Sequence, residues 1–120
     1  MKRIMMKSKI HRATVTGTKL GYEGSISIDP VLLEAADILP GEQVHVLNVN
    51  TGARMVTYAI LGERGSGEVM LNGPAARGAE AGDPVVVIAY GLLEDAPARC
   101  WQPRVVLVNA DNSVARVKGA

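Results

Sequence analysis

The chain has 120 residues, 48% hydrophobic and 21% charged, which indicates one globular domain with a modest core rather than separate nucleotide-binding and substrate domains. Its formal charge of +1 excludes the clear basic excess that is typical of a nucleic-acid-binding protein of this size. No apolar run approaches the roughly 20 residues that cross a bilayer, no export signal is recognisable, and a single cysteine, Cys100, excludes an internal disulfide. We therefore expect a cytoplasmic protein without a metal, a membrane contact or a bound nucleic acid.

Short runs rich in Val, Ile and Leu alternate with Gly, Pro, Asn and Asp along most of the chain, and Phe is absent. This texture indicates a small β-rich domain whose strands close into a barrel or sandwich, because open edges invite pairing with other chains. The predicted strands are Lys9–Thr16, Ser25–Ile28, Gln43–Asn48, Arg54–Leu61, Glu68–Leu71, Pro84–Tyr90, Arg104–Val108 and, as a hairpin return, Ser113–Val117.

One helix is well signalled between the second and third of these strands. Asp29 can cap it, Pro30 suits its first position, and Pro40-Gly41 ends it. Its apolar face is supplied by Val31, Leu32, Ala35, Ala36 and Leu39. A second helical piece of one or two turns is predicted over Pro74–Arg77.

The small net charge hides an uneven distribution along the chain. Six of the 13 bases precede Glu23, which is the first acid, and the remainder of the chain is net acidic. A basic N-terminal segment favours an anionic partner, for which a nucleic acid and a small dicarboxylate are both candidates. From charge alone, a solvated basic strand is the more ordinary interpretation.

The sequence Tyr22-Glu23-Gly24-Ser25 places a glycine directly before a serine. Taken alone, such a pair is most often just a turn. The pair also permits self-cleavage, because Gly24 lets the serine hydroxyl approach the preceding carbonyl, and a strained backbone favours an acyl shift to an ester. Elimination from that ester, followed by hydrolysis, would leave a pyruvoyl group made from Ser25 at the new N-terminus.

Six short motifs are spread in order over nearly the whole chain. They are Lys9-Ile10-His11-Arg12, Tyr22-Glu23-Gly24-Ser25, Arg54, Thr57-Tyr58-Ala59-Ile60, Glu63-Arg64-Gly65-Ser66 and Asn72-Gly73. Together they resemble the aspartate 1-decarboxylase family, whose members depend on a pyruvoyl group. The resemblance implies a mainly β fold, a small six-stranded double-psi β-barrel with one or two short helices, assembled as a homotetramer with active sites between neighbouring subunits.

The resemblance also implies a precursor that cuts itself between Gly24 and Ser25 into a 1–24 chain and a 25–120 chain, with Thr57 assisting. Ser25 would then carry the pyruvoyl group, form a Schiff base with L-aspartate and act as the electron sink for the loss of CO2. Tyr58 would return a proton to the former α-carbon. The product would be β-alanine for pantothenate and coenzyme A biosynthesis, made without a metal or pyridoxal phosphate.

The same resemblance assigns eight residues to substrate binding. They are Lys9, His11, Arg54, Thr57, Asn72, Gly73, Pro74 and Ala75. Arg54 offers a planar fork and Lys9 a movable point charge, which together suit the two carboxylates of aspartate. Which base takes which carboxylate stays open. The loop that starts at Asn72 presents backbone groups to a ligand, and Pro74 in it contributes a carbonyl but no N–H.

Strand alternation checks part of this assignment independently. Lys9 and His11 share one face of their strand, and Arg54 and Tyr58 share one face of theirs, as convergence on one pocket requires. Thr57 faces the opposite way from Tyr58. Both would reach one active centre only if the strand twists sharply or two subunits share the site.

Other interpretations stay open at this point. A small β-barrel with a basic arm also suits a nucleic-acid-binding or regulatory module without enzymatic activity. Other pyruvoyl enzymes act on histidine, adenosylmethionine or phosphatidylserine, although they are commonly longer and carry different motifs. A degenerate relative would keep the fold without cutting itself, which the intact Gly24-Ser25 pair argues against.

Overall fold

The computed structural model describes residues 1–21 and 23–119, and these residues form mainly strands. The strands, in chain order, are β1 (Lys2–Thr14), β2 (Gly17–Lys19), β3 (Ser25–Ile28), β4 (Gln43–Asn48), β5 (Arg54–Leu61), β6 (Val69–Asn72), β7 (Pro84–Glu94), β8 (Arg104–Val108) and β9 (Val114–Lys118). The helices are α1 (Pro30–Ala36), α2 (Asp95–Ala98) and the 3-10 helix η1 (Gly73–Gly78). None of the helices in the described ranges has both the length and the apolar character needed to span a bilayer.

The strands form one curled sheet, with the order β2-β6-β3-β5-β4-β7-β1-β8-β9 among the described residues. Strand β2 follows β1 almost at once in the chain, yet five strands separate the two in the sheet. The sheet therefore curls until its β2 edge returns to the end of β1, where the N–H of Thr16 donates to the carbonyl of Val69 in β6 across 2.8 Å. The prediction of a mainly β, small barrel-like domain with short helices is confirmed.

The described sheet holds nine strands, three more than the six that the resemblance implies for the barrel. Strand β2 has only three residues, and β9 lies at the outer edge, where it pairs with β8 alone. The pairing is mixed, because β1 with β8, β2 with β6 and β3 with β5 run parallel while the other pairs run antiparallel. Parallel neighbours cannot be joined by a tight hairpin, and in each of these three pairs other strands intervene along the chain.

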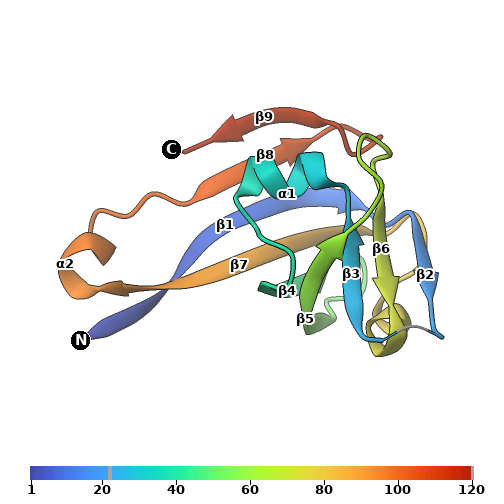
Figure 1. Cartoon of the computed structure of the whole chain (residues 1–120), viewed down its shortest axis with the longest axis horizontal. Coiled ribbons are helices and arrows are strands. Elements are labelled where there is room, and N and C mark those ends of the chain that lie inside the picture. Colours follow the sequence, from blue (N-terminus) through green and yellow to red (C-terminus); the bar gives the residue numbers. More distant parts are fainter. Residues whose placement is uncertain (22, 120) are drawn as a thin grey trace.

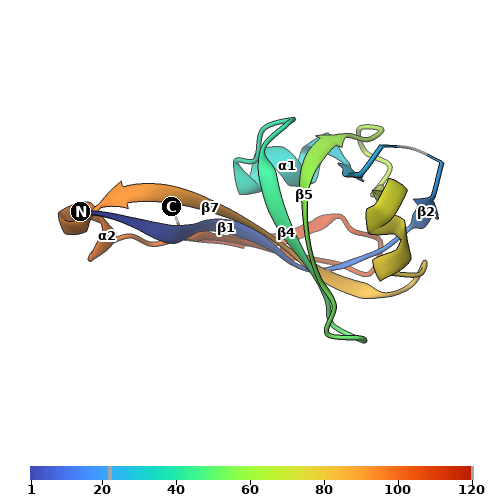
Figure 2. The ribbon, with the colours of Figure 1, turned by 90° about the horizontal axis from the view of Figure 1, so that it is seen from below.

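Strands β1 and β7 are longer than predicted and form a two-stranded arm. Their outer halves pair from Lys2 with Glu94 to Met6 with Tyr90, and the arm projects from the barrel toward α2 (Figures 1 and 2). Ile4 in this arm is 74% exposed. None of the paired residues in these outer halves is buried, and their sequence lacks the apolar alternation from which the inner halves were predicted.

Helix α1 begins as predicted and ends early. The carboxylate of Asp29 caps it by accepting a hydrogen bond from the N–H of Val31 across 2.9 Å, and Pro30 is the first helical residue. The helix stops at Ala36 because Asp37 adopts the left-handed conformation, with φ of 55°. Leu39, which we predicted on the apolar face of the helix, therefore lies beyond its end and is 66% exposed.

The barrel interior is filled by aliphatic side chains from alternate positions of the strands and from one face of α1. The largest fully buried side chains are those of Ile10, Val15, Ile26, Ile28, Leu32, Leu33, Val44, Val46, Val69, Leu71, Val85 and Val87. Strand β3 is buried along its whole length between β5 and β6. Ser25, at the start of β3, is thereby held by a closely packed wall.

Asp29 also fastens the loop between β5 and β6 to the start of α1. Its carboxylate accepts hydrogen bonds from the N–H groups of Gly65 and Gly67 across 3.0 and 2.8 Å. Burial alone would raise the pKa of Asp29, but the N–H groups of Gly67, Val31 and Gly65 outweigh that effect and hold the pKa below its ordinary value. The ionised carboxylate is therefore part of the folded structure.

Candidate active site

Ser25 is a buried serine at the first position of β3, paired with Asn72 at the last position of β6. The amide nitrogen of Asn72 donates a hydrogen bond to the Ser25 hydroxyl oxygen across 3.0 Å. The hydroxyl itself lies 3.4 Å from the carbonyl oxygen of Glu23. The serine oxygen is thus held close to the backbone that precedes it. Tyr22, the first residue of the same motif, lies outside the described residues.

Asn72 has a second serine partner. Its amide nitrogen also donates to the hydroxyl oxygen of Ser27 across 2.9 Å, while its own carbonyl oxygen is buried without a hydrogen-bond partner. All three side chains are buried. Ser25 and Ser27 therefore both accept hydrogen bonds from the side-chain nitrogen of Asn72.

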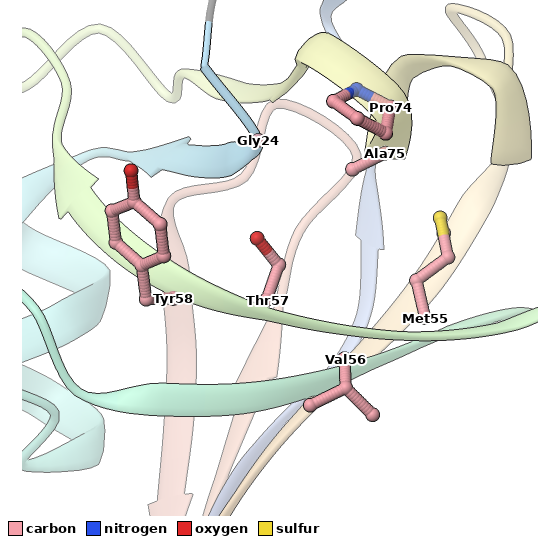
Figure 3. Close-up of a pocket in the computed structure, with 7 residues that line it drawn as sticks. All are labelled: Gly24, Met55, Val56, Thr57, Tyr58, Pro74 and Ala75. Atoms are coloured by element: carbon pink, nitrogen blue, oxygen red, sulfur yellow. The ribbon is translucent and has the colours of Figure 1, made fainter.

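A cavity of about 450 Å³ opens next to this cluster. It is lined by Gly24, Met55, Val56, Thr57, Tyr58, Pro74 and Ala75. The hydroxyl groups of Thr57 and Tyr58 point toward the side on which Gly24 lies, whereas the side chain of Val56 points away (Figure 3). The structure thus brings together five predicted site residues, from three separate parts of the chain.

Strand β5 explains how two neighbouring residues line the same cavity. From Arg54 to Tyr58 this strand pairs with β4, and β3 joins it only from Ala59 onward. The edge of β5 opposite β4 is therefore open at Thr57 and Tyr58, and the cavity lies along it. At an open edge, side chains from either face can turn toward the same space, so strand alternation does not separate Thr57 from Tyr58.

Helix η1 closes the other side of the cavity. Gly73 starts it with φ of 61°, a left-handed conformation that suits glycine. The ring of Pro74 lies so close to Gly24 that a Cβ atom added there would be 3.3 Å from the proline Cδ. Gly24 therefore avoids a tight contact with Pro74, and it also gives the Ser25 hydroxyl access to the preceding carbonyl.

Lys9, Arg54 and Tyr58 share the outer face of the sheet. Val56 pairs with His45, His45 pairs with Ile88, and Ile88 pairs with Lys9, so these side chains point to one side. Arg54 and Tyr58 join them by alternation with Val56. Arg54 lies about 13 Å along the strand from Tyr58, and Lys9 lies about 14 Å across three strand spacings from β5. Neither base lines the cavity of its own chain.

Arg54 and His11 have different surroundings. A guanidinium nitrogen of Arg54 lies 3.1 Å from Nδ1 of His45, and the His45 ring packs edge-on against Tyr90. His11, on β1, has a buried Nδ1 without a hydrogen-bond partner. Burial lowers the pKa of His11, and the neighbouring charges of Lys9 and Arg12 lower it further, which favours the neutral ring. His11 does not line the cavity either.

The comparisons with known proteins agree with one another. The model of the aspartate decarboxylase family matches residues 1–115. An aspartate 1-decarboxylase of Carboxydothermus hydrogenoformans is 55% identical over 114 residues, which cover 95% of this chain and 90% of that protein. An aspartate 1-decarboxylase of Thermoanaerobacter pseudethanolicus is 54% identical over 112 residues, covering 93% of this chain and 96% of that protein.

The chain belongs to the aspartate decarboxylase family. Its membership confirms the resemblance that the six motifs indicated, and the matched range contains every residue that we predicted for the site. It also favours the enzyme over a binding module without activity. Within the described part of this family member, no three His, Cys, Asp or Glu side chains are grouped so that they could hold a metal ion.

Part of the site escaped the sequence analysis. Met55 and Val56 line the cavity and Ser27 holds Asn72, yet none of them belongs to a predicted motif. For Ser27 a signal was present, because a serine between two isoleucines of a buried strand faces the same way as Ser25. For Met55 we find no local signal, since its place depends on the open edge of β5.

Proposed function

We propose that this family member cuts itself between Gly24 and Ser25 and then decarboxylates L-aspartate to β-alanine and CO2, as a carboxy-lyase of cytoplasmic pantothenate and coenzyme A biosynthesis. One observation carries the proposal. The buried Ser25 hydroxyl is held by Asn72 next to a cavity that presents the hydroxyls of Thr57 and Tyr58. Thr57 and Tyr58 line this cavity together with Gly24, the residue directly before Ser25.

Self-cleavage begins with the Ser25 hydroxyl oxygen. It attacks the carbonyl carbon of Gly24, the C–N bond between the two residues breaks, and an ester replaces the peptide bond. Thr57, which lines the cavity beside Gly24, is the group that assists this shift by donating a hydrogen bond to the carbonyl oxygen as charge develops on it. Elimination from the ester then separates residues 1–24 from residues 25–120, and hydrolysis of the resulting dehydroalanine leaves the pyruvoyl group.

The residues around Ser25 fit a pyruvoyl group at this position. Two amide hydrogens of Asn72 point at β3, and the carbonyl oxygen that a pyruvoyl group brings would meet a donor there rather than an acceptor. The neighbouring surface includes the small Gly24 and Ala75, which leave space for a substrate. When present, a pyruvoyl ketone supplies the electron sink that decarboxylation needs.

Tyr58 is the proton donor in this proposal. Its hydroxyl points into the cavity, and its side chain is 36% exposed, so it can reach a bound molecule. A positioned acid that returns a proton to carbon accelerates such a step by about 10²–10⁴-fold. Pro74 and Ala75 border the same space, directly after Asn72 and Gly73 in the chain, and the backbone of these four residues would orient the substrate.

Lys9, His11 and Arg54 would bind the substrate from a neighbouring subunit. They lie away from the cavity of their own chain, on a face that exposes apolar side chains such as Val56 at 56%. A homotetramer that buries this face would bring the bases of one subunit to the cavity of the next. Lys9 and Arg54 would then meet the two carboxylates of aspartate.

The test is the release of β-alanine from L-aspartate by the purified protein, with L-glutamate as a substrate longer by one methylene. We expect β-alanine from aspartate, no product from glutamate, and no product from Ser25→Ala. A fully cut protein that leaves L-aspartate unchanged would contradict the proposed reaction. The mass of the assembly in solution tests the tetramer separately.

A further inference from the structure

Ser27 is a polar residue at a buried strand position, where an apolar side chain is usual. It lies in the middle of β3, between Ile26 and Ile28, and is 8% exposed. Burying a hydroxyl in such surroundings is unfavourable unless it is hydrogen-bonded. Its hydroxyl oxygen accepts the hydrogen bond from the Asn72 amide, so its presence is explained by that contact.

Among the described residues, two hydrogen bonds set the orientation of the Asn72 amide. An asparagine amide nitrogen carries two hydrogens, and here one points to Ser27 and the other to Ser25, across 2.9 and 3.0 Å. The amide oxygen, buried without a partner, adds nothing to this orientation. Removing the Ser27 hydroxyl would leave the amide held by the reacting serine alone.

We propose that Ser27 is a positioning residue, which holds the Asn72 amide so that its other N–H points at the hydroxyl oxygen of Ser25. The proposal rests on the self-cleavage proposed above. Ser25 and Ser27 are two residues apart on one strand, so their hydroxyls flank the same amide on one face. Ser27 touches no reacting atom, and it acts through Asn72.

The step that gains most from this N–H is elimination from the ester. The α-proton of Ser25 passes to water, the Cβ–Oγ bond breaks, and its electron pair stays on the oxygen, which leaves as part of the Gly24 carboxylate. Water then adds to the dehydroalanine and ammonia is released. Negative charge develops on that oxygen, and a fixed N–H donor stabilises it.

Direct hydrolysis of the ester competes with elimination when the Asn72 N–H is displaced from the Ser25 oxygen. Water can hydrolyse the ester directly, which separates the same two fragments but leaves an intact serine at the start of residues 25–120. This fragment is heavier by one ammonia than the pyruvoyl fragment. Loss of Ser27 should therefore slow the formation of the pyruvoyl fragment and raise the share of the serine fragment.

The experiment follows self-cleavage of freshly purified full-length chain by intact mass over time, in the wild type and in Ser27→Ala. We expect the pyruvoyl fragment to form about three- to tenfold more slowly in Ser27→Ala, the effect of losing one hydrogen bond. Ser27→Thr keeps the hydroxyl and should restore the rate to within about twofold. Ser8→Ala, which removes another buried hydroxyl on β1, is the matched control and should cut at the wild-type rate.

A Ser27→Ala chain that is folded, by its melting temperature, and forms the pyruvoyl fragment at the wild-type rate and share overturns the proposal. If this variant does not fold, Ser27→Thr and Ser27→Val decide the matter, because they have the same shape and differ only in the hydroxyl. Equal rates in that pair also overturn it. A wild-type chain that never cuts itself contradicts the proposed function instead, whatever residue stands at position 27.

Discussion

Asn72 Nδ2 and Ser25 Oγ are joined by a hydrogen bond of 3.0 Å between the last residue of β6 and the first residue of β3. This bond joins two strands that run antiparallel and pair residue by residue, so the serine oxygen has little freedom to leave its place. The wall around it is packed and buried. The chemistry that we propose begins from this fixed oxygen.

Ser25→Ala should give a folded chain that is neither cut nor active. Alanine lacks the oxygen that attacks the Gly24 carbonyl, and its methyl group fits the buried space that the serine leaves. Denaturing gel electrophoresis and the β-alanine assay measure the two effects. Ser27→Thr, which retains the hydroxyls of the cluster, is the comparison. Any β-alanine formed by the alanine variant would contradict the role of Ser25.

Gly24→Ala should slow cutting without preventing folding. The new Cβ atom would lie 3.3 Å from Cδ of Pro74, so the two segments must move apart by a few tenths of an ångström. We expect a rate reduced by about tenfold, since displacing a reacting group from its productive geometry is costly. The double variant Gly24→Ala with Pro74→Ala removes the contact and should recover most of the rate. Equal rates in the single and double variants would contradict this packing argument.

The Tyr58→Phe variant should cleave itself at the normal rate but turn over L-aspartate slowly. The phenyl ring keeps the contacts at the cavity, but it has no proton to give, so we expect kcat to fall by about 100-fold or more. Mass spectrometry of the fragments and steady-state kinetics on L-aspartate separate the two steps. Tyr90→Phe, on strand β7, removes a hydroxyl outside the cavity and should leave kcat unchanged. A Tyr58→Phe enzyme with wild-type kcat would remove this residue from proton transfer.

Arg54→Lys should weaken substrate binding more than catalysis. A lysine supplies a point charge where the guanidinium offers a planar fork, and it also loses the contact of 3.1 Å with His45. We expect KM for aspartate to rise about tenfold, with a smaller change in kcat. Arg116→Lys, on the exposed strand β9, is the control. Unaltered saturation kinetics in Arg54→Lys would argue against a carboxylate contact.

Asp29→Asn should lower the free energy of unfolding at neutral pH by about 1–3 kcal/mol, because an ionised acceptor of three backbone N–H groups is lost. The pKa of Asp29 is lower in the folded chain than its ordinary value. Its contribution is therefore complete above the ordinary pKa and is lost as the pH falls through the folded-state value. Urea unfolding at a series of pH values from neutral to acidic measures how the free energy of unfolding depends on pH.

The comparison for this prediction is Asp37→Asn, which removes one charge from the exposed end of the same helix. That variant should lower the free energy of unfolding at neutral pH by less than Asp29→Asn does. In Asp29→Asn, the loss of stability between neutral and acidic pH should become smaller. If both variants kept the same pH dependence as the wild type, the hydrogen bonds to Asp29 would not contribute as we infer.

The strands of the barrel itself could be predicted closely from the sequence. For β3, β4, β5 and β8 the predicted bounds are the observed ones, because each is a short apolar run between turn residues. The arm could not be predicted, since the outer halves of β1 and β7 have no buried face to impose alternation. Strand β2 was missed because its three residues are paired only through β6, which comes some fifty positions later.

The candidate site likewise contains residues that could be predicted from the sequence and residues that could not. Gly24, Ser25 and Tyr58 belong to local motifs, and their grouping could be expected from the resemblance alone. Ser27 carries a local signal, because it faces the same way as Ser25 on a buried strand, but its role depends on Asn72, which lies 45 positions away in the chain. The shared cavity of Thr57 and Tyr58 likewise depends on where β3 joins β5, which is a property of the sheet.

The intact mass of the purified chain under denaturing conditions tests the central claim most directly. The account predicts two species, residues 1–24 and residues 25–120, the second lighter by one ammonia than a chain that starts with serine. A single mass of the full 120-residue chain that persists through prolonged incubation would contradict it.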